Sequence, residues 1–216
     1  MGRSKSSAGW LREHFNDVYV KKAQADGARS RAVYKLEELI ERDNLLKPGM
    51  NVVDLGAAPG SWSQLVRRRL GDSGKVFALD ILPMQGIAGV DFLEGDFREE
   101  SVLRELESRL AGLKVDLVLS DMAPNMSGVA LADQIRAMDL AELALDFSRQ
   151  WLKPGGALLI KLFQGAGFDD YLRGLRADFT RVTMRKPKAS RARSREVYAL
   201  ATGRKAVAAK TGGTPA

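Results

Sequence analysis

The chain has 216 residues, of which 45% are hydrophobic, so one domain can bury a sizeable core without disulfides or metals. It has no cysteine and one histidine, His14, which argues against disulfides, zinc sites, thiol nucleophiles and Ser-His-Asp hydrolysis, and we expect no bound metal. No segment reaches the roughly 20 apolar residues that span a bilayer, and the basic N-terminus lacks the apolar run of a signal peptide. A cytoplasmic protein without membrane contact is expected.

The net charge of +7 is distributed unevenly along the chain. Residues 1–35 carry eight Lys/Arg against three acids, residues 173–216 carry twelve against two, and the stretch between carries fourteen against twenty-two. Two basic ends around an acidic centre suggest that the ends converge on one face that binds a polyanion. The alternative is ordinary solvated charge together with a disordered tail.

The pattern of apolar residues predicts the elements in chain order. Residues 1–28 are polar and irregular and are interpreted as a basic N-terminal extension. From Arg31 to about Arg42 the apolar spacing predicts a helix, with Lys35 off the apolar stripe. Strands are predicted at 51–55, 75–80, 90–93, 115–120 and 157–162, and helices at 61–70, 99–110, 133–151 and 169–179. Two more strands, 180–185 and 196–201, follow without a helix between them.

This alternation predicts one α/β domain, residues 29–202. We expect a Rossmann-like fold: a mostly parallel sheet with helices on both faces and an antiparallel strand pair at its edge. Residues 203–216 are small and polar, and a disordered C-terminal tail is expected there.

A tight glycine turn, Gly56-Ala57-Ala58-Pro59-Gly60, joins the first strand of the domain to the next helix. Ser61 and Gln64 fit a capping box that opens this helix. In a doubly wound sheet, ligands bind where this turn meets the carboxyl ends of the strands. Asp80 ends the next strand, where a carboxylate can accept hydrogen bonds from both ribose hydroxyls of a nucleoside. The turn is therefore predicted to hold an adenosine-bearing cofactor.

The glycine spacing bears on which cofactor this is. Dinucleotide binding favours G-x-G-x-x-G, because the backbone must approach a pyrophosphate closely. Here Ala58 and Ser61 occupy the second and third glycine positions, and Pro59 lies inside the turn. S-adenosylmethionine has no phosphate, so the missing glycines are no obstacle to it.

Gly56 and Gly60 leave room for the methionine arm of that cofactor. Asp96, which follows another strand, and Trp62 are placed to meet the adenine. The simpler alternative is that these residues are structural turns and caps.

Four charged residues are predicted at the edge where a doubly wound fold gathers its chemistry. Lys35 lies on the helix before the first strand, Asp121 follows the strand VDLVLS, Lys161 ends the strand ALLIK, and Glu196 begins the last strand. Taken singly, Asp121 could cap a turn and Lys161 could extend from a strand end into water. A lysine inside an apolar strand is harder to dismiss, because burying an unpaired ammonium is expensive.

Taken together, these segments resemble the FtsJ family of RNA 2′-O-ribose methyltransferases, and most closely its bacterial members that act on large-subunit ribosomal RNA. The stretches that carry the resemblance run from about residue 30 to residue 200 and are SRAVYKLEEL, VVDLGAAPGSWSQ, VDLVLSDMAPNMSG, GGALLIKLFQG and KPKASRARSREVYAL. The family commonly has a second glycine at the position of Ser61, which puts the backbone of the turn in some doubt and touches no catalytic group.

The resemblance implies a Rossmann-like methyltransferase fold and a set of site residues. It implies a catalytic tetrad of Lys35, Asp121, Lys161 and Glu196. It implies cofactor contacts to S-adenosylmethionine at Gly60, Trp62, Asp80, Asp96 and Asp121. The implied reaction methylates the ribose 2′-hydroxyl of a uridine in 23S ribosomal RNA, on the assembled or assembling large (50S) subunit.

Such a tetrad suits the chemistry, because a ribose hydroxyl is a poor nucleophile that must meet the sulfonium methyl in line. Positioning alone can supply several kcal/mol, with about 7–11 kcal/mol as the ceiling. A general base then removes or orients the hydroxyl proton. Lys161 is the candidate for either role, and Asp121 and Glu196 would orient the amines.

A basic loop leads directly into Glu196. It contains no acid and carries six candidate RNA-binding residues, Arg185, Lys186, Lys188, Arg191, Arg193 and Arg195. Beside the catalytic strand, such a loop is well placed to hold phosphates on either side of a target ribose. The alternative is a localisation signal or a merely soluble loop.

The sequence therefore predicts a monomeric methyltransferase that acts on ribosomal RNA. A 2′-O-methyltransferase of another RNA, such as capped messenger RNA or transfer RNA, would share the tetrad. A noncatalytic RNA-binding assembly factor on the same fold is the alternative from another class. A nicotinamide dehydrogenase is disfavoured by the glycine pattern.

Overall fold

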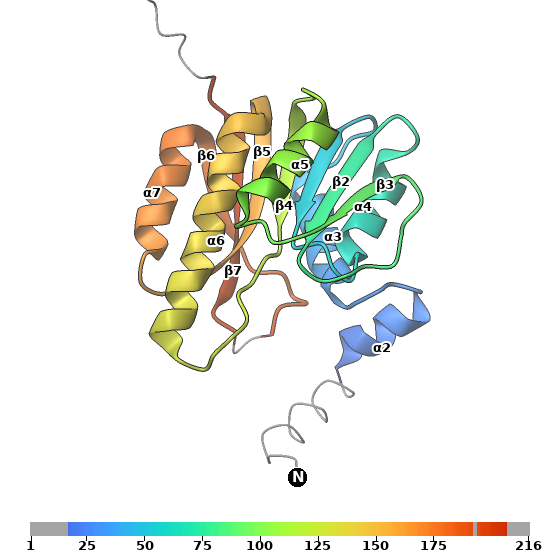
Figure 1. Ribbon diagram of the computed structural model, residues 1–216. Coiled ribbons are helices and arrows are strands. Elements are labelled where there is room, and N and C mark those ends of the chain that lie inside the picture. The colour runs from blue at the N-terminus through green and yellow to red at the C-terminus, as the bar shows by residue number, and fades with distance from the viewer. Residues whose placement is uncertain (1–16, 192–193, 207–216) are drawn as a thin grey trace, which may run out of the picture.

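In the part of the chain that the computed structural model describes, residues 17–191 and 194–206, seven strands form one sheet (Figure 1). Their order is β3-β2-β1-β4-β5-β7-β6. Their bounds are β1 Asn51–Leu55, β2 Lys75–Asp80, β3 Val90–Glu94, β4 Val115–Ser120, β5 Leu152–Phe163, β6 Phe179–Arg185 and β7 Glu196–Arg204. Strands β1 to β5 are parallel, and β7 is antiparallel to both of its neighbours. The predicted α/β fold is confirmed.

Helices cover both faces of this sheet (Figure 1). The described helices are α2 Val18–Ala25, α3 Ala32–Asp43, α4 Ser61–Leu70, α5 Glu100–Leu110, α6 Ala130–Trp151 and α7 Phe168–Asp178. Helices α3 and α4 pack on one face and α5, α6 and α7 on the other, and each face has its own apolar core. None of the helices in the described part of the chain is long and apolar enough to cross a membrane.

The predicted apolar stripe of α3 is buried as expected. Val33, Leu36, Leu39 and Ile40 are all buried against the α4 side of the sheet. Burial of each such side chain contributes about 1.5–3 kcal/mol. Lys35, off this stripe, does not join the apolar core and instead pairs with Glu196 at the start of β7.

Both ends of the domain depart from the prediction. The segment 1–28 was expected to be irregular, but residues 18–25 form α2, whose N-cap carboxylate at Asp17 accepts the N–H of Tyr19. The tail was expected to begin at Gly203, but β7 continues to Arg204, which is buried and donates to the carbonyl oxygen of Arg149. Hairpin pairing of β7 with β6 extends the strand this far, because Arg204 pairs with Phe179. Residues 1–16 and 207–216 lie outside the described part.

The predicted capping box at the start of α4 is wrong. The N-cap is Gly60, and the hydroxyl of Ser61 instead lies 2.6 Å from the hydroxyl of Ser30, which precedes α3. The side-chain oxygen of Gln64 is buried and has no hydrogen-bond partner among the described residues. Tertiary packing of the segment before α3 against α4 thus replaces the local cap.

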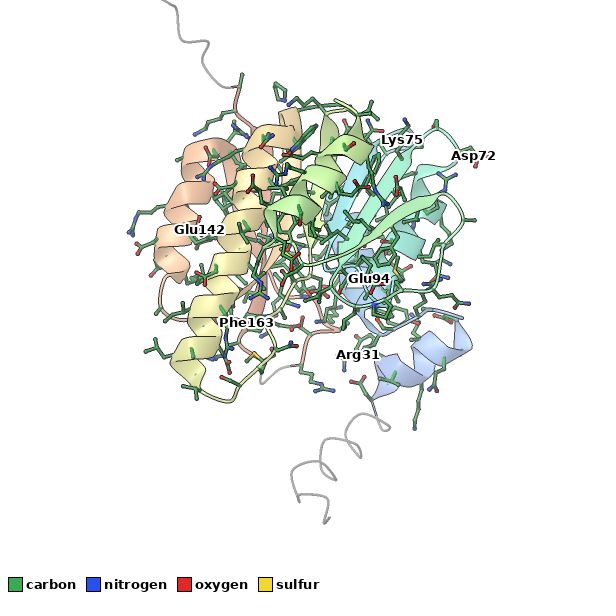
Figure 2. The ribbon with its side chains drawn as sticks, in the orientation of Figure 1. Arg31, Asp72, Lys75, Glu94, Glu142 and Phe163 are labelled. Atoms are coloured by element: carbon green, nitrogen blue, oxygen red, sulfur yellow. The ribbon has the colours of Figure 1, made fainter. Side chains whose placement is uncertain are left out.

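Because β7 is antiparallel to β5, its first residue lies beside the carboxyl end of β5. The carboxyl ends of the parallel strands β1 to β5 all lie at one end of the sheet. Strand β7 begins at that same end, where Glu196 pairs with Phe163, the last residue of β5. Figure 2 shows Phe163 and Arg31 at this end of the sheet and Lys75, at the start of β2, at the opposite end. The loop between β6 and β7 therefore lies beside the carboxyl ends of the parallel strands.

Candidate active site

The glycine turn after β1 requires glycine at both of its ends. Gly56 has φ +79°, and a Cβ there would lie 2.7 Å from the main-chain nitrogen of Met122, so a side chain would push away the loop that follows β4. Gly60 has φ +101°, and a Cβ there would lie 2.6 Å from the sulfur of Met84. Both positions combine a positive φ with a close approach, which only glycine tolerates.

Asp80 fastens this turn to the end of β2. One carboxylate oxygen accepts the N–H of Ala58 at 2.8 Å, and the other accepts the N–H of Leu82 at 2.8 Å. A carboxylate has about four lone-pair sites, so both oxygens can still accept further donors such as ribose hydroxyls. Beside it, Ile81 and Leu82 are apolar and more than half exposed. These two residues were missed by the sequence analysis, although exposed apolar residues directly after a strand are a visible signal.

A second carboxylate beneath the turn was also missed. Asp54, in the middle of β1, is fully buried, and one of its oxygens accepts the hydroxyl of Ser63 at 2.6 Å. The other oxygen has no hydrogen-bond partner among the described residues. Burial, together with the negative charges of Asp121 and Asp80, raises the pKa of Asp54 to about 7. Three carboxyl groups thus lie around the turn, and because the raised pKa keeps Asp54 partly protonated near neutral pH, the negative charge there comes from Asp80 and Asp121.

The two residues predicted to meet an adenine lie in different settings. Trp62 is 3% exposed, donates its indole N–H to the carbonyl oxygen of Ala32 at 2.8 Å, and packs in the α3–α4 core. What it can offer a ligand is its main-chain N–H, because the first N–H groups of a helix have no partner within the helix. Asp96 follows β3, and both of its oxygens accept hydrogen bonds from Arg98, which lowers its pKa.

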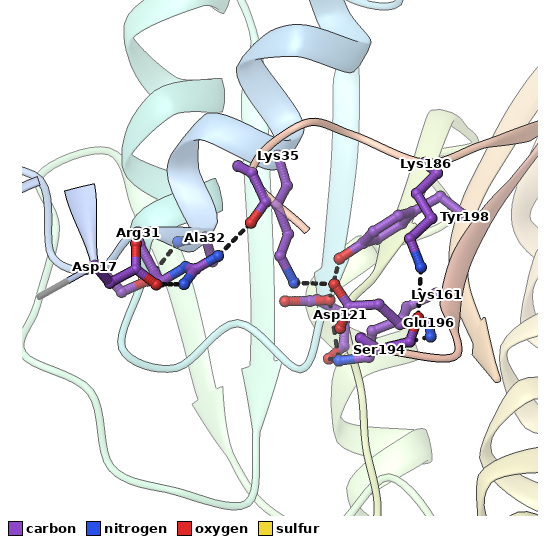
Figure 3. A network of polar contacts seen from close by, with 12 residues as sticks. Asp17, Arg31, Ala32, Lys35, Asp121, Lys161, Lys186, Ser194, Glu196 and Tyr198 are labelled. Carbon is purple, nitrogen blue, oxygen red and sulfur yellow. Dashed lines mark hydrogen bonds and ion pairs between the residues drawn. The ribbon is translucent and has the colours of Figure 1, made fainter. Parts of the chain in front are cut away.

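The structure brings the four predicted catalytic residues together as two neighbouring ion pairs (Figure 3). In the first, the ammonium of Lys35 on α3 donates to a carboxylate oxygen of Glu196 at 2.6 Å. Both side chains are largely buried, at 13% and 14% exposed. Burial acts to raise the pKa of Glu196, but the Lys35 charge and hydrogen bond outweigh it and hold the pKa below its ordinary value.

In the second pair, the ammonium of Lys161 lies 3.0 Å from a carboxylate oxygen of Asp121. It also donates to the main-chain carbonyl oxygen of Asp121 at 2.6 Å. The Asp121 N–H donates in turn to the carbonyl oxygen of Leu55 at 3.0 Å, which joins the end of β4 to the residue before Gly56. The Lys161–Asp121 pair therefore stands directly beside the glycine turn.

Tyr198 is a further site residue that sequence reasoning missed. Its hydroxyl donates to the Asp121 carboxylate at 2.9 Å, and burial and that carboxylate raise the pKa of Tyr198 well above its ordinary value. It pairs with Lys161 across the β5–β7 ladder, so the two side chains share a face. The signal that could have found it is its spacing, because residues two apart on a strand, here Glu196 and Tyr198, point the same way.

A cavity of about 510 Å³ opens next to the first pair. It lies between the segment before and into α3 and the end of the β6–β7 loop. Its lining is mostly polar and includes both members of the Lys35–Glu196 pair: Ser30, Arg31, Ala32, Lys35, Arg191, Ser194 and Glu196. A polar ligand that reached the tetrad from solvent would pass these residues.

The basic loop before β7 divides into anchors and exposed cations. Arg185 is an anchor, because its guanidinium is 12% exposed and binds both oxygens of Asp43 on α3. Lys186 donates to the carbonyl oxygen of Ser194 and so closes the loop on itself.

The remaining predicted RNA-binding residues lie farther out. Lys188 and Arg195 are exposed, and Arg191 is half-buried beside the cavity. Arg193 lies outside the described residues. Lys188, Arg191 and Arg195 thus form a cationic rim on this loop, of which Arg191 lines the cavity, and Arg185 is withdrawn from the rim.

Comparison with known proteins agrees with this geometry. The model of the FtsJ-like methyltransferase family matches residues 28–204. Two curated relatives, both named ribosomal RNA large subunit methyltransferase E, come from Stenotrophomonas maltophilia and Xanthomonas euvesicatoria. They are 67% and 66% identical over 204 and 203 residues, which is 94% of this chain and 97% of each relative.

A solved structure is also similar. A ribosomal RNA methyltransferase from Plasmodium falciparum superposes with a TM-score of 0.73 at 28% identity, over 83% of this chain and 100% of that one. The family match spans every element that builds the candidate site, from Lys35 on α3 to Tyr198 on β7. The chain belongs to the FtsJ-like methyltransferase family.

Proposed function

We propose that the protein transfers a methyl group from S-adenosylmethionine to the 2′-hydroxyl of a uridine ribose in large-subunit ribosomal RNA. The observation that carries this proposal is the double lysine–carboxylate site beside the glycine turn, at the mouth of a cavity with a cationic rim. The names of the relatives support the choice of ribosomal RNA.

The residues around the turn fit this cofactor. Its sulfonium and amino group are cationic, and Asp80 and Asp121 supply negative charge around the turn. The pyrophosphate of a dinucleotide would be repelled by the same two carboxylates. We assign Asp80 to the ribose hydroxyls and Gly56 and Gly60 to the methionine arm. The adenine is assigned to the space between the exposed side chains of Ile81 and Leu82 and the Asp96 loop.

When bound, the cofactor supplies an electrophilic methyl group. The chain must then hold a ribose hydroxyl in line with it and manage the hydroxyl proton. Lys161 is held at two points by Asp121 and lies next to the turn, so its ammonium can orient the hydroxyl oxygen. To act as the base it must first release one of its own protons to solvent, and the neutral amine then accepts the hydroxyl proton. Lys35 and Glu196 line the cavity and orient the ribose, and the Tyr198 hydroxyl fixes the Asp121 carboxylate.

The cationic rim would hold the RNA backbone on either side of the target. Lys188, Arg191 and Arg195 lie there, and Arg193 and the basic N-terminal segment add charge from outside the described residues. Contacts of this kind bind phosphates without reading sequence, so they position the ribose over the tetrad. We place the reaction in the cytoplasm, on the assembled or assembling 50S subunit, with the protein acting as a monomer.

The test is transfer of tritiated methyl groups to three substrates: isolated large subunits, naked ribosomal RNA and capped messenger RNA. We expect label on the large subunit, on ribose, and no label when the target nucleotide is 2′-deoxy. Label confined to capped messenger RNA would contradict the ribosomal assignment and keep the 2′-O chemistry. Cofactor and RNA binding without any transfer would favour a noncatalytic assembly factor.

A further inference from the structure

Arg29 ties together two loops that are distant in the sequence. It lies just before α3, and its guanidinium donates hydrogen bonds to three main-chain carbonyl oxygens. One belongs to Pro59 in the glycine turn, at 3.0 Å, and the others belong to Gln85 and Gly86 in the loop after β2, the latter at 3.0 Å. The planar fork of an arginine can satisfy several acceptors at once, which a lysine ammonium cannot match in geometry.

The loop that Arg29 grips, residues 81–89, lies against the glycine turn. A Cβ built on Gly60 would lie 2.6 Å from the sulfur of Met84, 2.9 Å from a guanidinium nitrogen of Arg29 and 3.0 Å from a methyl of Ile87. At its start the same loop is held by Asp80, which accepts the N–H of Leu82. The loop is therefore fastened at two places, by a carboxylate at its start and by a guanidinium at its middle.

The contacts of Arg29 are of an unusual kind for a half-buried arginine. In the described part of the chain it has no carboxylate within ion-pair distance, and its donors go to carbonyl dipoles of two loops. The next residue reinforces the same junction, because the Ser30 hydroxyl lies 2.6 Å from that of Ser61 at the start of α4. These contacts fix the main chain of the glycine turn and that of the loop after β2 relative to each other. A binding site made of loops requires such fixation, because otherwise the ligand must order the loops itself.

We propose that Arg29 is a positioning residue for cofactor binding: it holds the loop 81–89 against the glycine turn, so that Asp80 and the turn face the ligand together. The inference rests on the proposed function, because it assigns the cofactor to this turn. Arg29 contacts neither lysine pair, so it acts on binding rather than on the transfer step. Without it, each ligand would have to order the two loops itself, and that entropic cost would lower its affinity.

The experiment is calorimetric titration of RNA-free protein with S-adenosylmethionine and with S-adenosylhomocysteine. We expect R29A to weaken both by roughly tenfold or more, the scale expected for loss of several hydrogen bonds. R29K keeps the charge but not the fork, so it should fall between wild type and R29A. Steady-state kinetics should show a raised KM for the cofactor with kcat within about twofold of wild type. Amide hydrogen exchange should accelerate in residues 81–89.

The matched control is R109A. The Arg109 guanidinium also makes three hydrogen bonds, to Glu105, to Asp91 and to the carbonyl oxygen of Phe92, but it joins α5 to β3 away from the turn. It should leave cofactor affinity unchanged. R29K keeps the test decisive if R29A does not fold.

The outcomes separate the two proposals. The role of Arg29 would be overturned if R29A and R29K both bind the cofactor within twofold of the wild-type affinity. It would also be overturned if R109A loses as much cofactor affinity as R29A. Reduced RNA affinity with unchanged cofactor affinity would also overturn it and would make Arg29 a phosphate contact. No cofactor binding by the wild-type protein would overturn the proposed function itself.

Discussion

The two sides of the candidate site, one proposed to bind the cofactor and the other RNA, differ in the length and the fixation of their side chains. On the cofactor side, a glycine turn, a loop and three short carboxylates are fixed by hydrogen bonds of Asp80, Asp54 and Arg29 to nearby groups. On the RNA side, long cationic side chains extend from a loop whose main chain and first residues are anchored to α3 and the segment before it. One of these anchors is the Lys188 N–H, which donates to Glu38 at 2.8 Å.

This difference teaches what each side can recognise. Short groups in fixed positions select a ligand by shape and by hydrogen bonds, and buried charges are screened little by salt. Long exposed cations select by charge alone and release counterions when they bind phosphate. The tetrad stands at the boundary, with Lys161 on the cofactor side and Lys35 at the cavity. The two sides should therefore respond to different perturbations.

The largest effect is expected at the boundary itself. Lys161→Ala should lower turnover by about 10²–10⁴-fold, the range for a proton-transfer group, while cofactor affinity stays near that of wild type. Single-turnover transfer and calorimetry on the same preparation measure the two quantities. Near-normal turnover would show that Lys161 takes no part in the transfer step. An equal loss of cofactor affinity would show that Lys161 also contributes to cofactor binding, so that the two roles are not separate.

The next effect concerns the cofactor side alone. Asp80→Ala removes two hydrogen bonds that hold the turn and the loop, as well as the acceptor for the ribose hydroxyls. We expect cofactor affinity to fall by about tenfold to a hundredfold, because each charged hydrogen bond is worth roughly 1.5–3 kcal/mol. RNA affinity, measured without cofactor by filter binding, should not change. Unchanged cofactor affinity would take Asp80 out of the site.

A smaller effect should appear on the RNA side, in the salt dependence. Neutralising Arg191, Arg193 and Arg195 together should reduce the slope of log K against log salt by about 2–3 and leave cofactor binding intact. The matched control neutralises Lys75, Arg104 and Arg173, three cations on other elements, and should leave the slope as it is. Equal slopes for both triple variants would show that the rim does not hold phosphate.

The last expected effect is on stability rather than binding or turnover, and it belongs to the cofactor side. The pKa of Asp54 in the folded protein is raised to about 7, above the unfolded value near 3.8. The folded state holds that proton more tightly, so its stability falls as pH rises from about 4 to about 7. Asp54→Asn should remove this slope and exceed wild type at pH 8 by a few kcal/mol at most, with little difference at pH 4. Parallel stability curves from urea unfolding would show that Asp54 ionises normally.

Much of this architecture could be predicted from local patterns. Buried parallel strands are continuous apolar runs, and each of the seven predicted strands is present. Lys161 stood out because it interrupts such a run, and the tetrad as a set was implied by the family resemblance. The same reasoning applied to NVVDL would have found Asp54, since an acid inside an apolar strand is as costly as a lysine.

Other features depend on tertiary contacts that no local pattern contains. Arg185 looks like an RNA contact within its loop, but it is paired with Asp43, which lies 142 residues away in the sequence. Ser61 looks like half of a capping box, but it meets Ser30 from another segment. Arg29 has no local motif at all, because its partners are main-chain carbonyls of two distant loops. Such roles are determined by the packing of α3 and its preceding segment against α4, the end of β6 and the two loops at the glycine turn.

The antiparallel course of β7 separates the residues proposed to do the chemistry from those proposed to bind the RNA target. Glu196 is kept in register by the ladder with β5, where it faces Phe163. The described residues of the segment 186–195 immediately before it lie in no strand, so its exposed cations Lys188 and Arg195 can change without disturbing this ladder. Its buried Ala189 and the Ser194 hydroxyl, which accepts the N–H of Glu196, keep the loop beside the carboxylate. Relatives with other RNA targets can therefore arise through the rewriting of one hairpin connection. For the same reason, exchange of this loop is the most direct route to an enzyme retargeted to a chosen RNA.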